Sequence, residues 1–193
     1  MRMSNDSLRE RLRAQHYTHC YCEENVARLL SSRVPEMASG TCYAVFVTNA
    51  SRSVRVFETV WDYHVVILAV FRDVGALVFD LDALPDVPLP VDLSTYVSAA
   101  FPGDASPPLR PRFRVVLADT FLAHFASDRR HMRGPHGRWL ATPPLWPCFR
   151  GPHSASSHNL DEWLDVSDAS PSSDRGRVVA GVEELIKFIS TGS

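Results

Sequence analysis

A cysteine stands in this chain where a loop is predicted to become a helix. Cys22 is followed by Glu23 and a second glutamate, and apolar residues then recur at helical spacing as far as Leu30. Acidic residues in a first turn suit the positive end of the helix dipole, so we predict a helix from Glu23 to about Ser32. Free backbone N–H groups at a helix start lower the pKa of a thiol, which makes Cys22 a candidate nucleophile. The alternative is a small buried apolar side chain.

A β-hairpin is predicted further along the chain. Residues 61–71 and 76–81 form two runs of apolar, β-branched and aromatic side chains, and a short segment that includes Gly75 separates them. Gly75 can adopt the left-handed conformation that closes a three-residue hairpin connection. We therefore expect two antiparallel strands joined by an odd number of residues.

This hairpin carries a histidine and two aspartates. With an odd connection, His64 lies opposite Asp82 and diagonal to Asp80 on one face of the sheet, whereas an even connection separates His64 from Asp80. Cysteine, histidine and aspartate are the nucleophile, base and orienting acid of a thiol hydrolase. Their order along the chain is that of papain-like and transglutaminase-like folds. Spacing alone does not choose between the two aspartates, and a hydrogen-bonded strand histidine and strand-end carboxylates are the structural alternatives.

The composition is that of a domain that folds alone, with 193 residues and 45% hydrophobic content. A formal net charge of -2 and the absence of a long basic run give no reason to expect nucleic acid or a membrane as a partner. The longest apolar stretch, Val65–Phe71, is far below the roughly 20 residues of a membrane span. Met1–Gln15 has no apolar leader core, so we expect a cytoplasmic or nuclear protein. Thiols stay reduced there, and disulfides are not expected among the cysteines Cys20, Cys22, Cys42 and Cys148.

The remaining pattern predicts an α/β (α+β) fold with a mainly antiparallel sheet flanked by helices. We expect residues 1–16 to be an N-terminal extension or short surface helix, and residues 17–193 to form a single catalytic domain. Further strands are predicted at 42–48, 54–57, 113–117 and 177–180. Further helices are predicted at 94–101, from a cap at Asp119 to about Phe125, from Asn159 or Asp161, and at 182–189.

Several short blocks occur in one order from about Tyr17 to Leu160. They are CYCEEN at 20–25, YAVF at 43–46, WDYHVV at 61–66, DLD at 80–82, TYV at 95–97, FRV at 113–115, FASDR at 125–129, PC at 147–148 and NL at 159–160. In these blocks the chain resembles the protein N-terminal glutamine amidohydrolase family. WDYHVV and FASDR are the most specific of them.

The resemblance implies a monomeric, papain-like α/β fold that deamidates an N-terminal glutamine side chain to glutamate, which feeds the arginine branch of the N-degron pathway. It implies a catalytic triad of Cys22, His64 and Asp80, substrates that are protein or peptide N-termini beginning with Gln, and downstream N-degron enzymes as further partners. No metal or organic cofactor is implied. The connection 49–61 is shorter than expected for the family, and the segment 151–158 differs from it in character. We therefore expect any difference from the family to affect substrate preference.

A free N-terminus presents an α-ammonium group, which carboxylates or carbonyls bind best. Charged residues on a surface and aromatic residues in a core are the alternatives to a role in such a site. The candidate carboxylates are Glu24, Asp62, Asp82 and Asp128, and the aromatic residues that could wall the glutamine pocket are Tyr21, Trp61 and Tyr63.

Two other functions use the same residues. One is a cysteine protease or transglutaminase with the same triad, which would release peptide fragments or form crosslinks instead of releasing ammonia. The other is a non-catalytic zinc module, although a C-x-C pair lacks the C-x2-C spacing of ordinary structural zinc sites. Its ligands would be His19, Cys20 and Cys22, with His16, Cys148 or His153.

Overall fold

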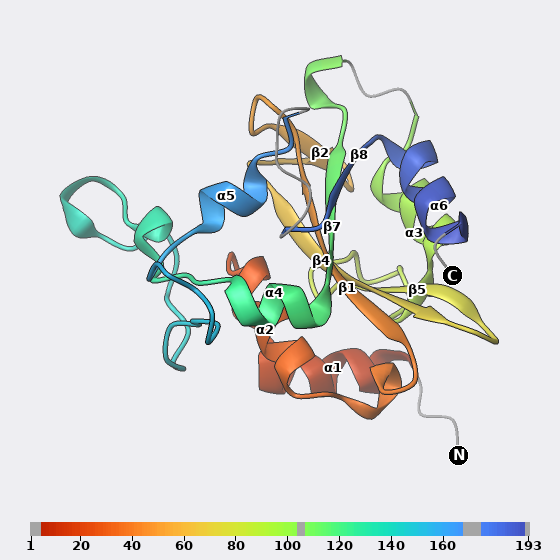
Figure 1. The fold of residues 1–193 in the computed structure, drawn as a ribbon, viewed down its shortest axis with the longest axis horizontal. Coiled ribbons are helices and arrows are strands. Elements are labelled where there is room, and N and C mark those ends of the chain that lie inside the picture. The colour runs from red at the N-terminus through yellow and green to blue at the C-terminus, as the bar shows by residue number, and fades with distance from the viewer. Residues whose placement is uncertain (1–4, 104–106, 168–174, 192–193) are drawn as a thin grey trace.

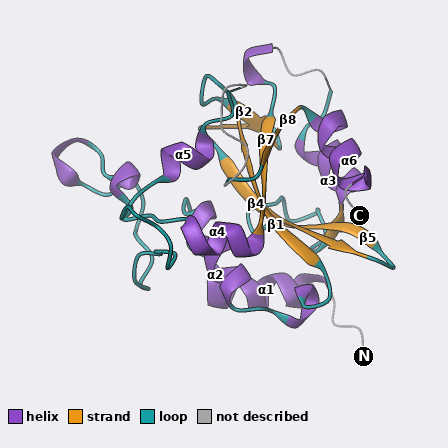
Figure 2. Ribbon diagram, in the orientation of Figure 1, coloured by secondary structure: helices purple, strands orange, loops and turns teal. Residues whose placement is uncertain are grey.

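The computed structural model describes residues 5–103, 107–167 and 175–191. Its centre is a six-stranded sheet in the order β6-β5-β4-β1-β7-β8, in which every pair of neighbours is antiparallel (Figures 1 and 2). The strands are β1 Thr41–Thr48, β4 His64–Phe71, β5 Gly75–Phe79, β6 Val91–Asp92, β7 Arg112–Leu117 and β8 Arg177–Ala180. A separate two-stranded ribbon consists of β2 Val54–Val56 and β3 Thr59–Trp61. The predicted antiparallel sheet is confirmed.

Helices cover both faces of the sheet, so the mixed α+β class is confirmed. Four helices share one apolar cluster with alternate residues of β1, such as Ala44 and Phe46. They are α1 Asn5–His16, α2 Cys22–Ser31, α4 Ala118–His124 and α5 Leu160–Leu164. Val45 and Val47 point to the opposite cluster, which includes α3 Leu93–Ala100 and α6 Val182–Thr191. β1 is therefore buried on both faces, which explains its nearly continuous apolar sequence.

The connection between β4 and β5 has the predicted odd length. Phe71 pairs with Gly75, so residues 72–74 form a three-residue connection, and Gly75 has a φ of +79°. Ile67 pairs with Phe79 in the same register. Continued to the start of β4, this register brings His64 level with the residues that follow β5, where Asp80 and Asp82 lie.

Three local predictions are wrong. Trp61 belongs to β3 and not to β4, because residues 62 and 63 interrupt the apolar run. β2 ends before Phe57, whose φ of 49° is incompatible with a strand. Asp119 lies inside α4, and the helix is capped by Leu117 without a side-chain hydrogen bond.

The first helix, α1, packs against the rest of the domain. Leu12 of α1 has no exposed surface, and Leu8 is buried in the same apolar cluster as α2. The first four residues of the predicted extension lie outside the described residues. Within the part of the chain that the structure describes, none of the helices has the length and apolar character needed to cross a membrane.

Candidate active site

Cys22 is the first residue of α2, one position earlier than the predicted helix start. Its side chain is 7% exposed, and its Sγ lies 3.7 Å from Oε2 of Glu23. Burial raises the pKa of the Cys22 thiol well above its ordinary value, the charges of Glu23, Asp82 and Asp80 raise it further, and the backbone N–H of Val65 opposes them. The predicted lowering of this pKa is therefore wrong, because desolvation outweighs the helix terminus. This direction favours the protonated thiol over the thiolate.

His64 and Asp80 form a buried pair. His64 Nε2 lies 3.0 Å from Asp80 Oδ2, and both side chains are almost fully buried. Tyr96 donates a hydrogen bond to the same carboxylate oxygen at 2.8 Å, and the backbone N–H of Asp82 donates to Oδ1 at 2.8 Å. Of the two aspartates that spacing left open, Asp80 is thus the one that contacts the imidazole.

The charges of this pair stabilise each other. Burial lowers the pKa of His64, but the charge and hydrogen bond of Asp80 outweigh it, and the net shift is upward. Burial raises the pKa of Asp80, but His64, the Asp82 N–H and the Tyr96 hydroxyl outweigh it, and the net shift is downward. Both directions mean that the Asp80 carboxylate stabilises the imidazolium that forms when His64 takes up a proton.

The nucleophile candidate and the imidazole approach the same end of β4 from different sides. Cys22 belongs to the apolar cluster of α2, together with Val65, and the two residues line one small cavity. His64 precedes Val65 and contacts Asp80, which α3 covers through Tyr96. Nδ1 of His64 is buried and has no hydrogen-bond partner among the described residues. The end of β4 therefore lies beside Cys22, through Val65, and carries the His64–Asp80 pair.

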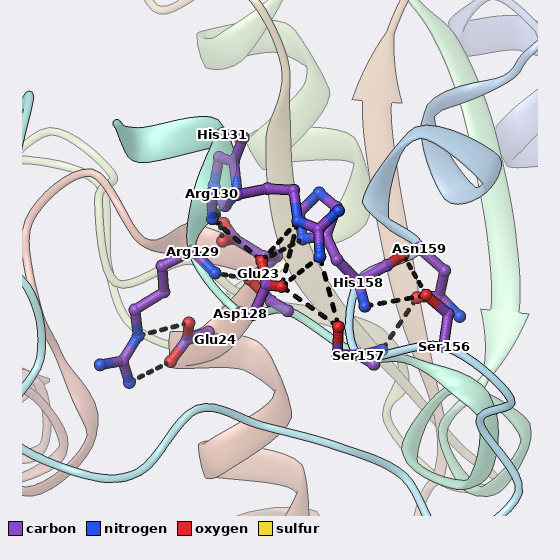
Figure 3. A network of polar contacts seen from close by, with 12 residues as sticks. Glu23, Glu24, Asp128, Arg129, Arg130, His131, Ser156, Ser157, His158 and Asn159 are labelled. Atoms are coloured by element: carbon purple, nitrogen blue, oxygen red, sulfur yellow. Dashed lines mark hydrogen bonds and ion pairs between the residues drawn. The ribbon is translucent and has the colours of Figure 1, made fainter. Parts of the chain in front are cut away.

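Glu24, one of the predicted ammonium ligands, is already paired. Arg129 donates two hydrogen bonds to its carboxylate, each 2.8 Å long (Figure 3). The indole N–H of Trp146 adds a third at 3.2 Å. The Glu24 side chain has no exposed surface. It joins α2 to Arg129 and Trp146, and both of its oxygens already accept hydrogen bonds.

The other predicted carboxylates differ in their surroundings. Asp128 accepts hydrogen bonds from the exposed Arg130 and from Ser157. Asp62 is exposed. Asp82 is half-buried and accepts a hydrogen bond of 2.6 Å from the hydroxyl of Tyr17.

The three aromatic residues predicted to wall the glutamine pocket also lie in different surroundings. Tyr21 has no exposed surface and donates to the carbonyl of Ala141, so it is a core residue. The Trp61 ring lies with its centroid 5.3 Å from that of His64, which places it beside the imidazole. Tyr63 is half-buried, and its hydroxyl donates to Glu23 at 3.0 Å.

Sequence reasoning missed two residues of this site. Glu23 has no exposed surface, and its carboxylate lies between the Tyr63 hydroxyl and Nε2 of His131, which is 3.2 Å away (Figure 3). Tyr96 holds Asp80 from α3. The sequence signals for them were weak: an acidic residue next to the cysteine, and a tyrosine in a predicted helix.

The structure also bears on the zinc alternative. Among the described residues, the group of potential metal ligands consists of His64, Asp80 and Asp82, whose ligand atoms lie within 4.8 Å of one another. Neither Cys20 nor Cys22 belongs to it. All four cysteines are free thiols.

The family model described as N-terminal glutamine amidase matches residues 17–189. The chain belongs to this family. The relatives include the protein N-terminal glutamine amidohydrolase of Drosophila pseudoobscura pseudoobscura, 40% identical over 181 residues that cover 86% of this chain and 85% of the relative. The proteins of the same name from Bos taurus and Homo sapiens are 36% and 35% identical over 163 residues, 78% of this chain in each case and 77% and 78% of the relatives. The family match spans α2, the β4–β5 hairpin and the 125–160 segment, which are the parts that build the site.

Proposed function

We propose that this chain hydrolyses the side-chain amide of glutamine at a protein or peptide N-terminus, leaving glutamate and releasing ammonia. Membership of the N-terminal glutamine amidase family supports the substrate. The observation that carries the chemistry is the 3.0 Å contact between His64 and Asp80 at the end of β4 where Cys22 begins a helix. We assign the roles of nucleophile, base and orienting acid to Cys22, His64 and Asp80.

The proposed reaction has two halves. His64 takes the proton of the Cys22 thiol as the sulfur attacks the side-chain carbonyl carbon, and the imidazolium then gives that proton to the departing nitrogen. The C–N bond breaks, ammonia leaves and a thioester remains. A water molecule, deprotonated by His64, attacks the thioester carbon, the C–S bond breaks and the sulfur regains its proton. Each turnover consumes one water and uses no cofactor.

The electrostatics of the site suit this sequence. The nucleophile rests as a thiol, so it needs a base at the moment of attack, and the raised pKa of His64 makes the imidazole a stronger proton acceptor. Asp80 holds Nε2, and we assign the unpartnered Nδ1 the role of accepting the thiol proton. We assign one oxyanion donor to the backbone N–H of Cys22, at the helix start, where such a donor lowers a barrier by about 3 to 4 kcal/mol.

We further propose that the fold is papain-like, because the helix that begins at the nucleophile packs against the sheet that carries the histidine. We propose residues 17–193 as the catalytic domain, acting as a monomer in the cytoplasm or nucleus. The four free thiols are consistent with a reducing compartment.

The test is mass spectrometry of a peptide that begins with Gln. We expect a gain of about 1 Da with ammonia release, since an amide NH2 is replaced by OH, and no gain when the α-amine is acetylated. Cys22→Ala, His64→Ala and Asp80→Asn should abolish or strongly reduce the reaction, whereas the neighbouring Cys20→Ala should keep most of it. Full activity of Cys22→Ala would refute the assignment. Peptide fragments or crosslinks in place of ammonia would favour a protease or a transglutaminase.

A further inference from the structure

Asp82 is left without a role once Asp80 is paired with the imidazole. It lies two residues beyond Asp80, and its backbone N–H is the donor that holds Asp80 Oδ1. Its own Oδ1 accepts the short hydrogen bond from Tyr17. Among the described residues its carboxylate makes no ion pair. The charges of His64 and Arg13 act on this carboxylate through space, but neither residue forms an ion pair with it, so a half-buried carboxylate with one oxygen fixed would gain from a ligand that supplies a cation.

The Asp82 carboxylate is close to the reacting groups. Asp82 and Cys22 line the same small cavity, at the end of β4. A ligand atom of Asp82 lies within 4.8 Å of those of His64 and Asp80. The negative charge of Asp82 raises the pKa of the Cys22 thiol, which is a second sign that the two groups are near each other.

The substrate has a positive charge at the matching distance. In glutamine, four bonds separate the side-chain amide carbon from the α-nitrogen, which is roughly 4 to 5 Å for bonds of about 1.5 Å. A carboxylate a few ångströms from the thiol and imidazole can therefore meet the α-ammonium group while the amide carbon faces the sulfur.

The other nearby carboxylates are less suited to bind the α-ammonium group. Glu24 is paired with Arg129. Asp128 is paired with Arg130 and accepts a hydrogen bond from Ser157. Glu23 has no exposed surface and is hydrogen-bonded to Tyr63. Asp62 is exposed, where an ion pair in water contributes little.

We propose that Asp82 binds the α-ammonium group of the substrate, and that Tyr17 is the positioning residue that fixes its carboxylate. This inference rests on the proposed function. It explains in physical terms why a free N-terminus would be required: an acetylated or internal glutamine would bury Asp82 without a counter-charge. The bound ammonium would also offset one of the negative charges that hold Cys22 as a thiol, so that recognition would favour activation of the nucleophile.

The test compares two peptides of identical sequence, one beginning with Gln and one whose first residue lacks only the α-amino group. For the unaltered protein we expect kcat/KM to be at least about 100-fold higher for the Gln peptide, as for sites built around a buried polar contact. In Asp82→Asn this ratio should collapse to within a few-fold of one, because the Gln peptide loses the counter-charge of its α-ammonium group. Tyr17→Phe should reduce the ratio part of the way, and the control Asp62→Asn should leave it unchanged.

The outcomes separate this inference from the proposed function. If the unaltered protein releases no ammonia from the Gln peptide, the proposed function is wrong. If it does, and Asp82→Asn keeps the full ratio while melting normally, only the role of Asp82 is wrong. A collapse of the ratio in Glu23→Gln but not in Asp82→Asn would also overturn it. Should Asp82→Asn fail to fold, Asp82→Ser is used for the same comparison.

Discussion

Two adjacent arginines of this protein make the same kind of contact in different surroundings. Arg129 forms a bidentate pair with Glu24, and the two side chains are 8% and 0% exposed. Arg130 forms a bidentate pair with Asp128, and these side chains are 63% and 31% exposed. Figure 3 shows both pairs side by side. We predict that Arg129→Met strongly destabilises the protein and that Arg130→Met does not.

The magnitude follows from what each change leaves behind. Removing one partner of a buried ion pair costs about 3 to 5 kcal/mol, because the other charge stays buried alone. Trp146 still donates to Glu24 in the Arg129 variant, so we expect a loss of about 3 kcal/mol, at the lower end of that range. For a domain of this size that loss lowers the melting temperature by roughly 6 to 12 °C. Water screens the Arg130 pair, so its loss should not shift the midpoint measurably.

Urea unfolding and thermal melting of the two variants test this directly. Arg129 has a φ of 64°, and methionine is as strained there as arginine, so backbone strain cancels in the comparison. Adding Glu24→Gln to Arg129→Met should recover part of the loss, since the stranded charge is removed. Equal losses for the two arginine variants, or a loss below about 1 kcal/mol for Arg129→Met, would refute the reasoning.

Two further predictions concern stability. Because the pKa of Asp80 is lowered and that of His64 is raised, their pair stabilises the fold fully between the ordinary values of 3.8 and 6.5; this contribution is lost as pH falls through the Asp80 pKa or rises through the His64 pKa. The difference in unfolding free energy between the unaltered protein and His64→Gln should therefore be bell-shaped against pH, and a flat difference would contradict it. Gly181→Ala should cost about 1 to 2 kcal/mol for its positive φ alone. Gly176→Ala should cost more in the same urea titration, because its Cβ would lie 2.1 Å from the Val115 carbonyl oxygen, and similar losses at the two glycines would argue against that clash.

The parts of the site that sequence predicted are those encoded locally. The two apolar runs and Gly75 were enough to predict the hairpin. Its connection, residues 72–74, has the predicted odd length, and Gly75 has the positive φ on which that prediction rested. The helix beginning near Cys22 followed from spacing and acidic residues in its first turn. Both patterns depend on neighbours within a few residues.

The parts that sequence could not give depend on distant contacts. Tyr96 reaches Asp80 only because α3 packs on the sheet. Glu24 is paired with Arg129, which lies 105 residues later in the chain. The thiol pKa was predicted in the wrong direction because the helix terminus is a local feature, whereas burial is set by the whole core around Cys22.

The burial of Cys22 has a consequence for chemical labelling. Cys148 is exposed, whereas Cys22 is buried and rests protonated. Alkylating reagents and oxidants select thiols by accessibility and by thiolate content, and on accessibility Cys148 has the advantage. One equivalent of an electrophile would therefore mark the protein at Cys148 and leave turnover intact, so the extent of labelling would not measure occupancy of the nucleophile.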